Sequence, residues 1–174
     1  MSTPERFALI LGVLATVPVF AQEGPNLGVE ATAEQVAGWA ISIPPDGTGL
    51  PAGSGTAADG AAVYAAQCLA CHGEEGVNGP NDRLVGGHGT LASDSPVRTV
   101  GSFWPYATTV FDYIRRSMPI IQPQSLSDDE VYAVTAYLLE LNGIINEGDV
   151  MNAETLPQVE MPNADNFVWA YEGE

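Results

Sequence analysis

Apolar residues recur at helical spacing in four stretches of the chain, and polar residues suited to capping stand at several of their starts. The predicted helices cover residues 33–39, a stretch from Thr56 or Asp59 to Cys71, a stretch from Pro105 to the residue before Pro119, and residues 128–141. Capping boxes are expected at Thr32 with Gln35 and at Ser127 with Glu130. Residues 73–101 are rich in glycine and predict a long loop, and no stretch has a convincing strand pattern.

The first 21 residues have the pattern of a secretory signal peptide. The apolar run from Phe7 to Phe20 follows Arg6 and is 14 residues long, which is short for a bilayer span. Cleavage is expected after Ala21, while an uncleaved anchor or a buried helix are the alternatives. The expected organisation is a signal peptide 1–21, an N-terminal extension 22–55, a domain 56–146 and a C-terminal extension 147–174. We therefore expect export to the periplasm, without a membrane span after cleavage.

The charge balance is strongly negative because bases are scarce. The 174 residues include 22 acidic residues, five arginines and no lysine, giving a formal net charge of −17. Such a surface repels phosphate groups, so nucleic acid and anionic lipid headgroups are not expected as partners. An apolar content of 45% is sufficient for a globular core. Two cysteines are too few for a disulfide framework.

Both cysteines lie in the run Cys68-Leu69-Ala70-Cys71-His72, which is the c-type haem attachment pattern. Cysteines three positions apart share one face of a helix, so each can form a thioether to a haem vinyl group. The histidine that follows then lies beneath the iron and supplies a nitrogen ligand. The motif predicts one covalently attached haem c, bound by Cys68 and Cys71, with His72 as an iron ligand.

Three other uses of these residues are conceivable on chemical grounds. A thioredoxin-like dithiol requires a βαβ setting, which the pattern of elements does not provide. Zinc could take Cys68, Cys71, His72 and His88, but the adjacency of Cys71 and His72 differs from the paired spacing of zinc ligands. A disulfide across two intervening residues would be strained.

The second iron ligand is predicted to be Met118. It follows a predicted helix and precedes Pro119, and a residue before proline is driven out of helical geometry. A thioether ligand raises the reduction potential of a histidine-ligated haem. His88, in a glycine-rich loop, and Met161 are the alternatives. Met161 and Met151 are expected to pack in the core instead.

Further contacts to the haem are expected from the residues around the motif. An iron-bound histidine donates its other ring N–H to a backbone carbonyl or a similar acceptor. The Pro80 carbonyl is predicted to be this acceptor for His72. Arg98 and Trp104, with Arg83 as a further candidate, are predicted to donate to the haem propionates.

One glycine and one tyrosine predict how the attachment helix packs on the last helix. Gly60 lacks a side chain and would let a facing helix approach closely. Tyr64, one turn later on the same face, is expected to pack against Tyr137 or Leu138.

The layout of attachment helix, long loop, helix, Met-Pro and final helix resembles a class I cytochrome c, an all-α fold with helices around one haem. The chain also resembles the SoxD and sulfite dehydrogenase cytochrome subunit family in its monohaem form. This similarity extends over roughly residues 45–167 and is most specific over 101–118. It is carried by residues 45–51, 68–73, 84–87, 99–107, 111–119, 123–133 and 161–163.

The resemblance implies a periplasmic cytochrome that accepts single electrons from a molybdopterin subunit oxidising sulfite or protein-bound sulfane sulfur. A downstream cytochrome or oxidase would then receive the electrons. At the matching positions, Cys68 and Cys71 would attach the haem, and His72 and Met118 would ligate the iron. Many SoxD chains carry a second haem domain, whereas this sequence contains no second attachment motif, so a monohaem protein is expected.

Two other functions remain open on sequence grounds. A free-standing electron carrier would share the haem site but need no molybdenum partner. A haem peroxidase would require an open iron position, which a Met118 ligand would fill. A subunit role is favoured because the segment from Asn146 onward shows no core of its own and is expected to pack on something.

Overall fold

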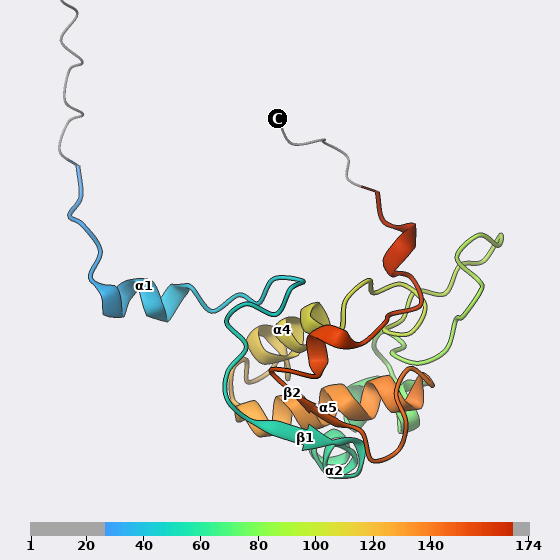
Figure 1. Ribbon diagram of the computed structural model, residues 1–174. Helices are drawn as coiled ribbons and strands as arrows, with labels where there is room; N and C mark the ends of the chain where they lie inside the picture. Colours follow the sequence, from blue (N-terminus) through green and yellow to red (C-terminus); the bar gives the residue numbers. More distant parts are fainter. Residues whose placement is uncertain (1–26, 169–174) are drawn as a thin grey trace, which may run out of the picture.

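The computed structural model describes residues 27–168 and is predominantly helical (Figure 1). Its α-helices are α1 (Ala33–Trp39), α2 (Ala57–Gln67), α3 (Leu69–His72), α4 (Ala107–Ser117) and α5 (Asp128–Leu141). Two short strands, β1 (Ser54–Thr56) and β2 (Val150–Asn152), and the 3₁₀ turns η1 (Glu74–Gly76), η2 (Leu156–Gln158) and η3 (Ala164–Asn166) complete it. The predicted signal peptide, 1–21, lies outside the described residues. Within 27–168 no helix is long and apolar enough to cross a membrane.

Local capping chemistry places the starts of three helices. The capping boxes predicted for α1 and α5 are both complete, which confirms these two starts. A third capping box begins α2, where the Thr56 side chain accepts from the Asp59 N–H and the Asp59 side chain accepts from the Thr56 N–H. Thr56 is therefore the N-cap and Asp59 the third helical residue, so both residues that the sequence suggested mark the same start. Helix α4 begins at Ala107, two residues after the expected Pro105, because Tyr106 is still extended.

The attachment helix α2 crosses α5 at very close range, as expected from Gly60. A Cβ added to Gly60 would lie 2.0 Å from the Ala133 carbonyl oxygen, so only glycine permits this backbone approach. One turn later, the Tyr64 and Tyr137 rings meet with centroids 5.3 Å apart, confirming the predicted aromatic contact. This crossing fixes the orientation of the end of α2, where the attachment motif begins.

The core lies between α4, α5 and the segment that follows α5. Its fully buried side chains include Phe111, Tyr132, Leu139 and Leu156, the last of which comes from the C-terminal segment. Met151 and Met161 are each only 4% exposed, which confirms the expectation that they pack in the core. The segment after α5 therefore belongs to the hydrophobic core of the domain.

The sequence pattern did not predict the two-stranded antiparallel sheet. In it β1 pairs with β2, with Gly55 opposite Met151. Each strand has three residues, too few for an alternating pattern to be recognised. A Cβ on Gly55 would lie 2.3 Å from the Ala133 nitrogen, so this glycine lets β1 lie directly on α5. Figure 1 shows β1 and β2 side by side across α5.

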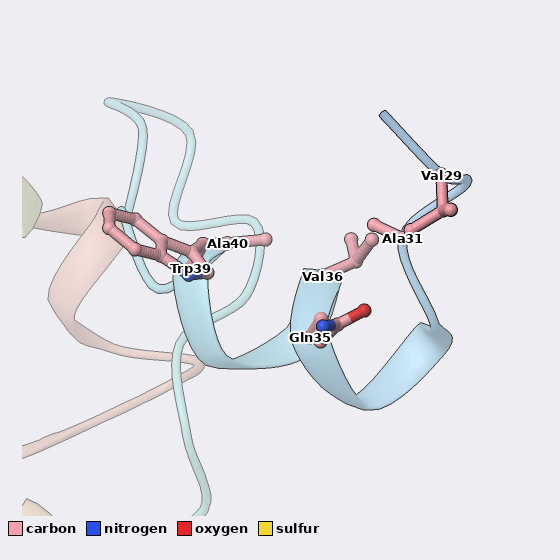
Figure 2. Close-up of a pocket in the computed structure, with 6 residues that line it drawn as sticks. All are labelled: Val29, Ala31, Gln35, Val36, Trp39 and Ala40. Atoms are coloured by element: carbon pink, nitrogen blue, oxygen red, sulfur yellow. The ribbon is translucent and has the colours of Figure 1, made fainter. Parts of the chain in front are cut away.

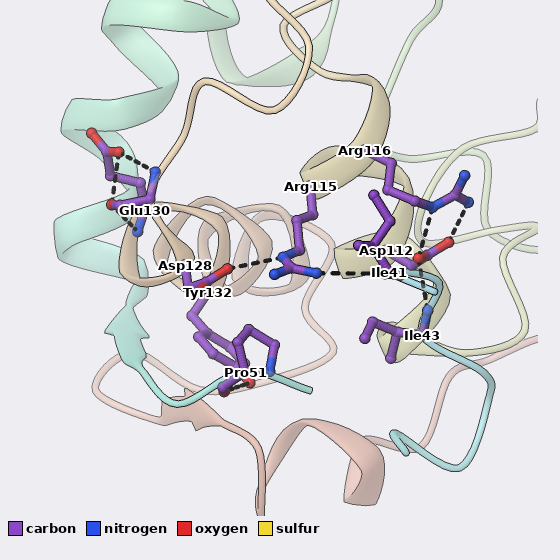
Figure 3. A network of polar contacts seen from close by, with 10 residues as sticks. Ile41, Ile43, Pro51, Asp112, Arg115, Arg116, Asp128, Glu130 and Tyr132 are labelled. Atoms are coloured by element: carbon purple, nitrogen blue, oxygen red, sulfur yellow. Dashed lines mark hydrogen bonds and ion pairs between the residues drawn. The ribbon is translucent and has the colours of Figure 1, made fainter. Parts of the chain in front are cut away.

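We call residues 41–53 the N-terminal strap, because side chains of α4 and α5 bind its backbone along its length (Figure 3). The hydrogen bonds run from Arg115 to the Ile41 carbonyl (3.4 Å), from the Ile43 N–H to Asp112 (2.8 Å), from Thr108 to the Pro45 carbonyl (3.0 Å) and from Tyr132 to the Pro51 carbonyl (2.9 Å). Within α4, the Arg116 guanidinium also donates to Asp112, at 2.9 Å from Nε. Asp112 thus links the strap to the helix that leads into Met118.

The Asp112 carboxylate sets a pH dependence of stability. Burial raises its pKa, but the hydrogen bonds from Arg116 and the Ile43 N–H, with the charges of the two arginines, outweigh burial and hold the pKa below the ordinary 3.8. A carboxyl with a lowered pKa in the folded state stabilises the fold above its unfolded pKa, and this contribution is lost as the pH falls through the lowered value.

We expect Asp112→Asn to reduce the free energy of unfolding by about 1–2 kcal/mol at pH 7, because a charged acceptor of two donors is removed. The deficit relative to the parent protein should begin to shrink as the pH falls below about 3.8, where the unfolded parent chain starts to bind a proton, and should vanish only below the lowered pKa of the folded carboxyl. Urea unfolding between pH 3 and 7 measures this. Asp94→Asn, at an exposed position, is the control. A deficit that is constant over the whole pH range would contradict the role assigned to the charge.

Candidate functional site

The attachment motif lies on one tight turn at the end of α2. Cys68 ends α2 and caps α3, and its carbonyl accepts from the N–H groups of Cys71 (3.1 Å) and His72 (2.9 Å). Both thiols are free, and the two cysteines and the histidine are all half-buried. The three side chains are thus presented together, partly accessible, as the spacing predicted.

A backbone carbonyl holds the His72 ring from one side. Its Nδ1 lies 2.7 Å from the Asp82 carbonyl oxygen, so Nδ1 carries the proton and donates it. The Nε2 atom then has a free lone pair, as a metal ligand requires. The predicted acceptor was the Pro80 carbonyl, whereas the Asp82 carbonyl occupies this position. A hydrogen bond from the Asn81 N–H to the Cys71 carbonyl (2.9 Å) fixes the loop after the motif. The next residue, Asp82, then places its carbonyl at the His72 ring.

Two glycines permit the sharp return of the chain after His72. Gly73 has φ +79°, and a Cβ there would lie 1.9 Å from the Val77 carbonyl oxygen. A Cβ on Gly79 would lie 2.4 Å from the Cys71 carbonyl oxygen. Tyr64 ties this turn to α2 by donating to the Gly73 carbonyl at 2.8 Å. Neither glycine was predicted to have this role, although a glycine directly after the motif was a signal for a positive φ.

The environment of Cys68 disfavours a redox dithiol. Burial, with a smaller contribution from the nearby Cys71, raises the pKa of the Cys68 thiol to about 11. A dithiol that exchanges disulfides requires a lowered pKa, because the thiolate is the reactive form. The thioredoxin-like alternative therefore does not fit this site.

The zinc alternative also lacks a donor set. Within residues 27–168, no three side chains of His, Cys, Asp or Glu come together in a way that could hold a metal ion. His88, the fourth ligand of that alternative, is exposed. A metal at His72 must therefore bring further ligands of its own, as the iron of a haem does through its four porphyrin nitrogens.

Met118 lies where α4 ends, in extended geometry with φ −120° and ψ 145°. This confirms the expectation that Pro119 drives it out of the helix. Its side chain is half-buried against the core, as are Cys68, Leu84, Trp104 and Leu126. Each of these apolar side chains is thus only partly covered by the core. Half-buried apolar side chains, two cysteines on one turn and an oriented imidazole are the residue types that would hold a large flat apolar group with a metal at its centre.

The proposed propionate donors differ in how far they are buried. The Trp104 ring packs edge-to-face on Tyr113 with centroids 5.6 Å apart, and is half-buried. Arg98 is exposed, and its guanidinium lies 5.4 Å from the centre of the Phe103 ring. Arg83 is exposed as well and donates from Nε to the Val85 carbonyl at 2.7 Å. Among the described residues, neither Arg83 nor Arg98 forms an ion pair with an acidic side chain.

Comparison with known proteins adds two similarities. A family model described as cytochrome C oxidase, cbb3-type, subunit III matches residues 55–138. A chain in the crystal structure of the sulfane dehydrogenase SoxCD from Paracoccus pantotrophus is 43% identical, with a TM-score of 0.78, and the match covers 83% of this chain and 71% of that chain. A search of curated proteins found no match.

Proposed function

The chain belongs to the class I cytochromes c of the SoxD type, and from this premise we propose that it is a periplasmic monohaem cytochrome that accepts electrons from a molybdenum-containing sulfite or sulfane dehydrogenase. As a cytochrome of this type it is an electron-transfer protein. The observation that carries the proposal is the local geometry of the motif. Two cysteines and an imidazole with its Nδ1–H bound to the Asp82 carbonyl occupy one turn, and Cys68 packs against the core.

Each residue of the site has a separate role in this proposal. Cys68 and Cys71 attach one haem through thioethers, and His72 supplies the nitrogen ligand through Nε2. Met118 would supply a second iron ligand from the end of α4. Bound haem provides an iron that cycles between its ferrous and ferric states. With His72 and Met118 both holding the iron, neither peroxide nor oxygen would find a free ligand position, which disfavours a peroxidase.

The surrounding residues hold the group and exclude water from it. Trp104 and Leu126, already packed on the core, would cover its faces. Trp104 and Arg98 would donate to the propionates, and within residues 27–168 Arg98 forms no ion pair with an acidic side chain. The Asp82 carbonyl keeps the His72 ring oriented and makes it more basic, which supports a stable ligand bond. In this proposal Pro80 has no contact with the ligand histidine.

The charge distribution supports a basic partner in the periplasm. Of the four arginines within residues 27–168, Arg115 and Arg116 are paired with Asp128 and Asp112. The remaining surface is dominated by acidic side chains, and a partner with a basic docking patch would be attracted to it. The similar chain belongs to a sulfane dehydrogenase, which favours a molybdopterin subunit as the source of electrons and a further cytochrome or oxidase as the acceptor.

The proposal is tested by a visible spectrum of the oxidised protein, purified gently from the periplasm of its host. Sulfite, and then thiosulfate as a source of sulfane sulfur, are added in turn. We expect one of them to reduce the haem, and a protein that contains molybdenum to co-purify. A haem that stays oxidised until ascorbate is added, with no co-purifying molybdenum protein, would instead identify a free-standing carrier.

A further inference from the structure

The segment before the strap stands apart from the rest of the molecule. Residues 27–40, which we call the N-terminal arm, are exposed at every position and contain α1 (Figure 1). The apolar side chains are the most notable: Leu27 is 87%, Val29 94%, Val36 52% and Trp39 88% exposed. The hydrophobic effect disfavours apolar side chains that stay in water. A group of exposed apolar side chains therefore indicates a surface that binds another molecule.

The arm nevertheless carries a defined helix. Both halves of the capping box between Thr32 and Gln35 are formed. A helix of seven residues is too short to be stable in water alone, and tertiary packing normally supplies the missing stability. Figure 2 shows the residues that line a shallow hollow along this helix: Val29, Ala31, Gln35, Val36, Trp39 and Ala40. The arm thus presents a preformed, one-sided apolar surface with a large aromatic side chain at its end.

The charge of the arm indicates which kind of partner would cover its apolar side chains. It carries Glu30 and Glu34 and no basic residue. A second copy of this chain, with its own net charge of −17, would repel it, and so would anionic lipid headgroups. A different protein with an apolar groove and a basic rim is complementary to it.

The structural similarity extends into this part of the chain. The match to the SoxCD chain covers 83% of 174 residues, about 144 residues. Only 134 residues lie between Ile41 and Glu174, so the match includes residues before Ile41. At least part of a segment that is exposed at every position therefore has a counterpart in the sulfane dehydrogenase SoxCD.

We propose that the N-terminal arm is a docking element, in which Val36 and Trp39 insert into an apolar groove with a basic rim on the molybdenum subunit. This inference rests on the proposed function. The strap then connects the docked arm to the haem domain. Residues 41–53 follow the arm directly and are hydrogen-bonded to α4 and α5. A partner bound at the arm would be held close to the cytochrome between electron transfers, as a tethered reactant at high effective concentration.

The test compares two double variants of the full chain. Val36→Ser with Trp39→Ser removes the apolar contacts, whereas Ala33→Ser with Ala37→Ser introduces the same number of serines into the same helix away from the hollow. The probe is the molybdenum protein that co-purifies with the parent chain, separated and then titrated back. Loss of a central aromatic anchor costs 2 kcal/mol or more in typical interfaces, so we expect the V36S/W39S variant to bind about 30-fold more weakly. The A33S/A37S variant should bind like the parent.

The outcomes separate this inference from the proposed function. Haem content, visible spectrum and thermal unfolding should be the same in both variants, because the arm packs on no part of the core. Equal binding of both variants to the molybdenum protein would overturn the docking role of the arm alone. A parent chain that captures no molybdenum protein would overturn the proposed function and the docking partner together. If the parent chain formed dimers and the V36S/W39S variant did not, the partner of the arm would be a second copy of this chain. This result would overturn the assignment of the arm to the molybdenum subunit.

Discussion

Replacing Met118 by leucine is expected to lower the reduction potential of the haem protein by roughly 0.1 V or more, within the range of about 0.8 V that axial ligands control. Leucine has nearly the volume of methionine, so packing at the end of α4 is retained while the thioether sulfur is lost. A thioether opposite histidine favours ferrous iron and raises the potential, and its removal therefore lowers it. Potentiometric titration of the purified protein measures this change.

The same variant should gain the ability to bind carbon monoxide when reduced at neutral pH, because one axial position becomes free. The parent protein should not bind it. Met161→Leu is the matched control, since it makes the same exchange at a core methionine that is only 4% exposed. A Met118→Leu protein with an unchanged potential and no carbon monoxide binding would assign the ligand to another residue, with His88 as the next candidate.

Replacing Gly60 by alanine is expected to reduce the free energy of unfolding by about 3 kcal/mol or more, the upper part of the range for overpacking in a core. The added Cβ would lie 2.0 Å from the Ala133 carbonyl oxygen and 2.8 Å from the Tyr137 Cβ. Backbone cannot rotate away as a flexible side chain does, so α2 and α5 must separate. Urea unfolding of the haem-loaded protein measures the loss.

Gly38→Ala provides a matched control for this variant. Gly38 lies inside α1, and a Cβ added there would meet nothing within 4 Å. The exchange at Gly38 should therefore leave the stability of the domain unchanged, because alanine is otherwise the better helix residue. If Gly60→Ala and Gly38→Ala had the same effect, the close crossing of α2 and α5 would not be the reason for glycine at position 60.

Local sequence signals identified the elements and the chemistry of the site. The Cys68 to His72 spacing identified the attachment motif, and capping boxes located the starts of α1 and α5. The helical stripe of α5 and the Met-Pro dipeptide at the end of α4 were likewise recognised correctly. Each of these signals lies within a few residues, because capping, periodicity and the effect of proline all act over one or two helical turns.

Contacts between distant segments could not be read in this way. The carbonyl at the His72 ring belongs to Asp82 rather than Pro80, and the difference of two residues depends on how Gly73 and Gly79 return the chain. The hydrogen bonds from the strap to Asp112 and Tyr132 join positions 69 and 81 residues apart, and no local pattern reports such pairings.

The C-terminal segment likewise differs between what its sequence pattern predicts and what the tertiary structure shows. Its sequence has no periodicity, yet Met151, Leu156 and Met161 are core residues and β2 pairs with β1 almost a hundred positions earlier. The amino-acid sequence was sufficient for the haem motif, the methionine before proline and the glycine contact at position 60, since these depend on residue type and short spacing. Tertiary structure alone decided which carbonyl orients His72, which segments complete the core and that the arm is left uncovered. These features follow from the packing of the whole chain, in which the burial of apolar surface by one segment depends on where all the others lie.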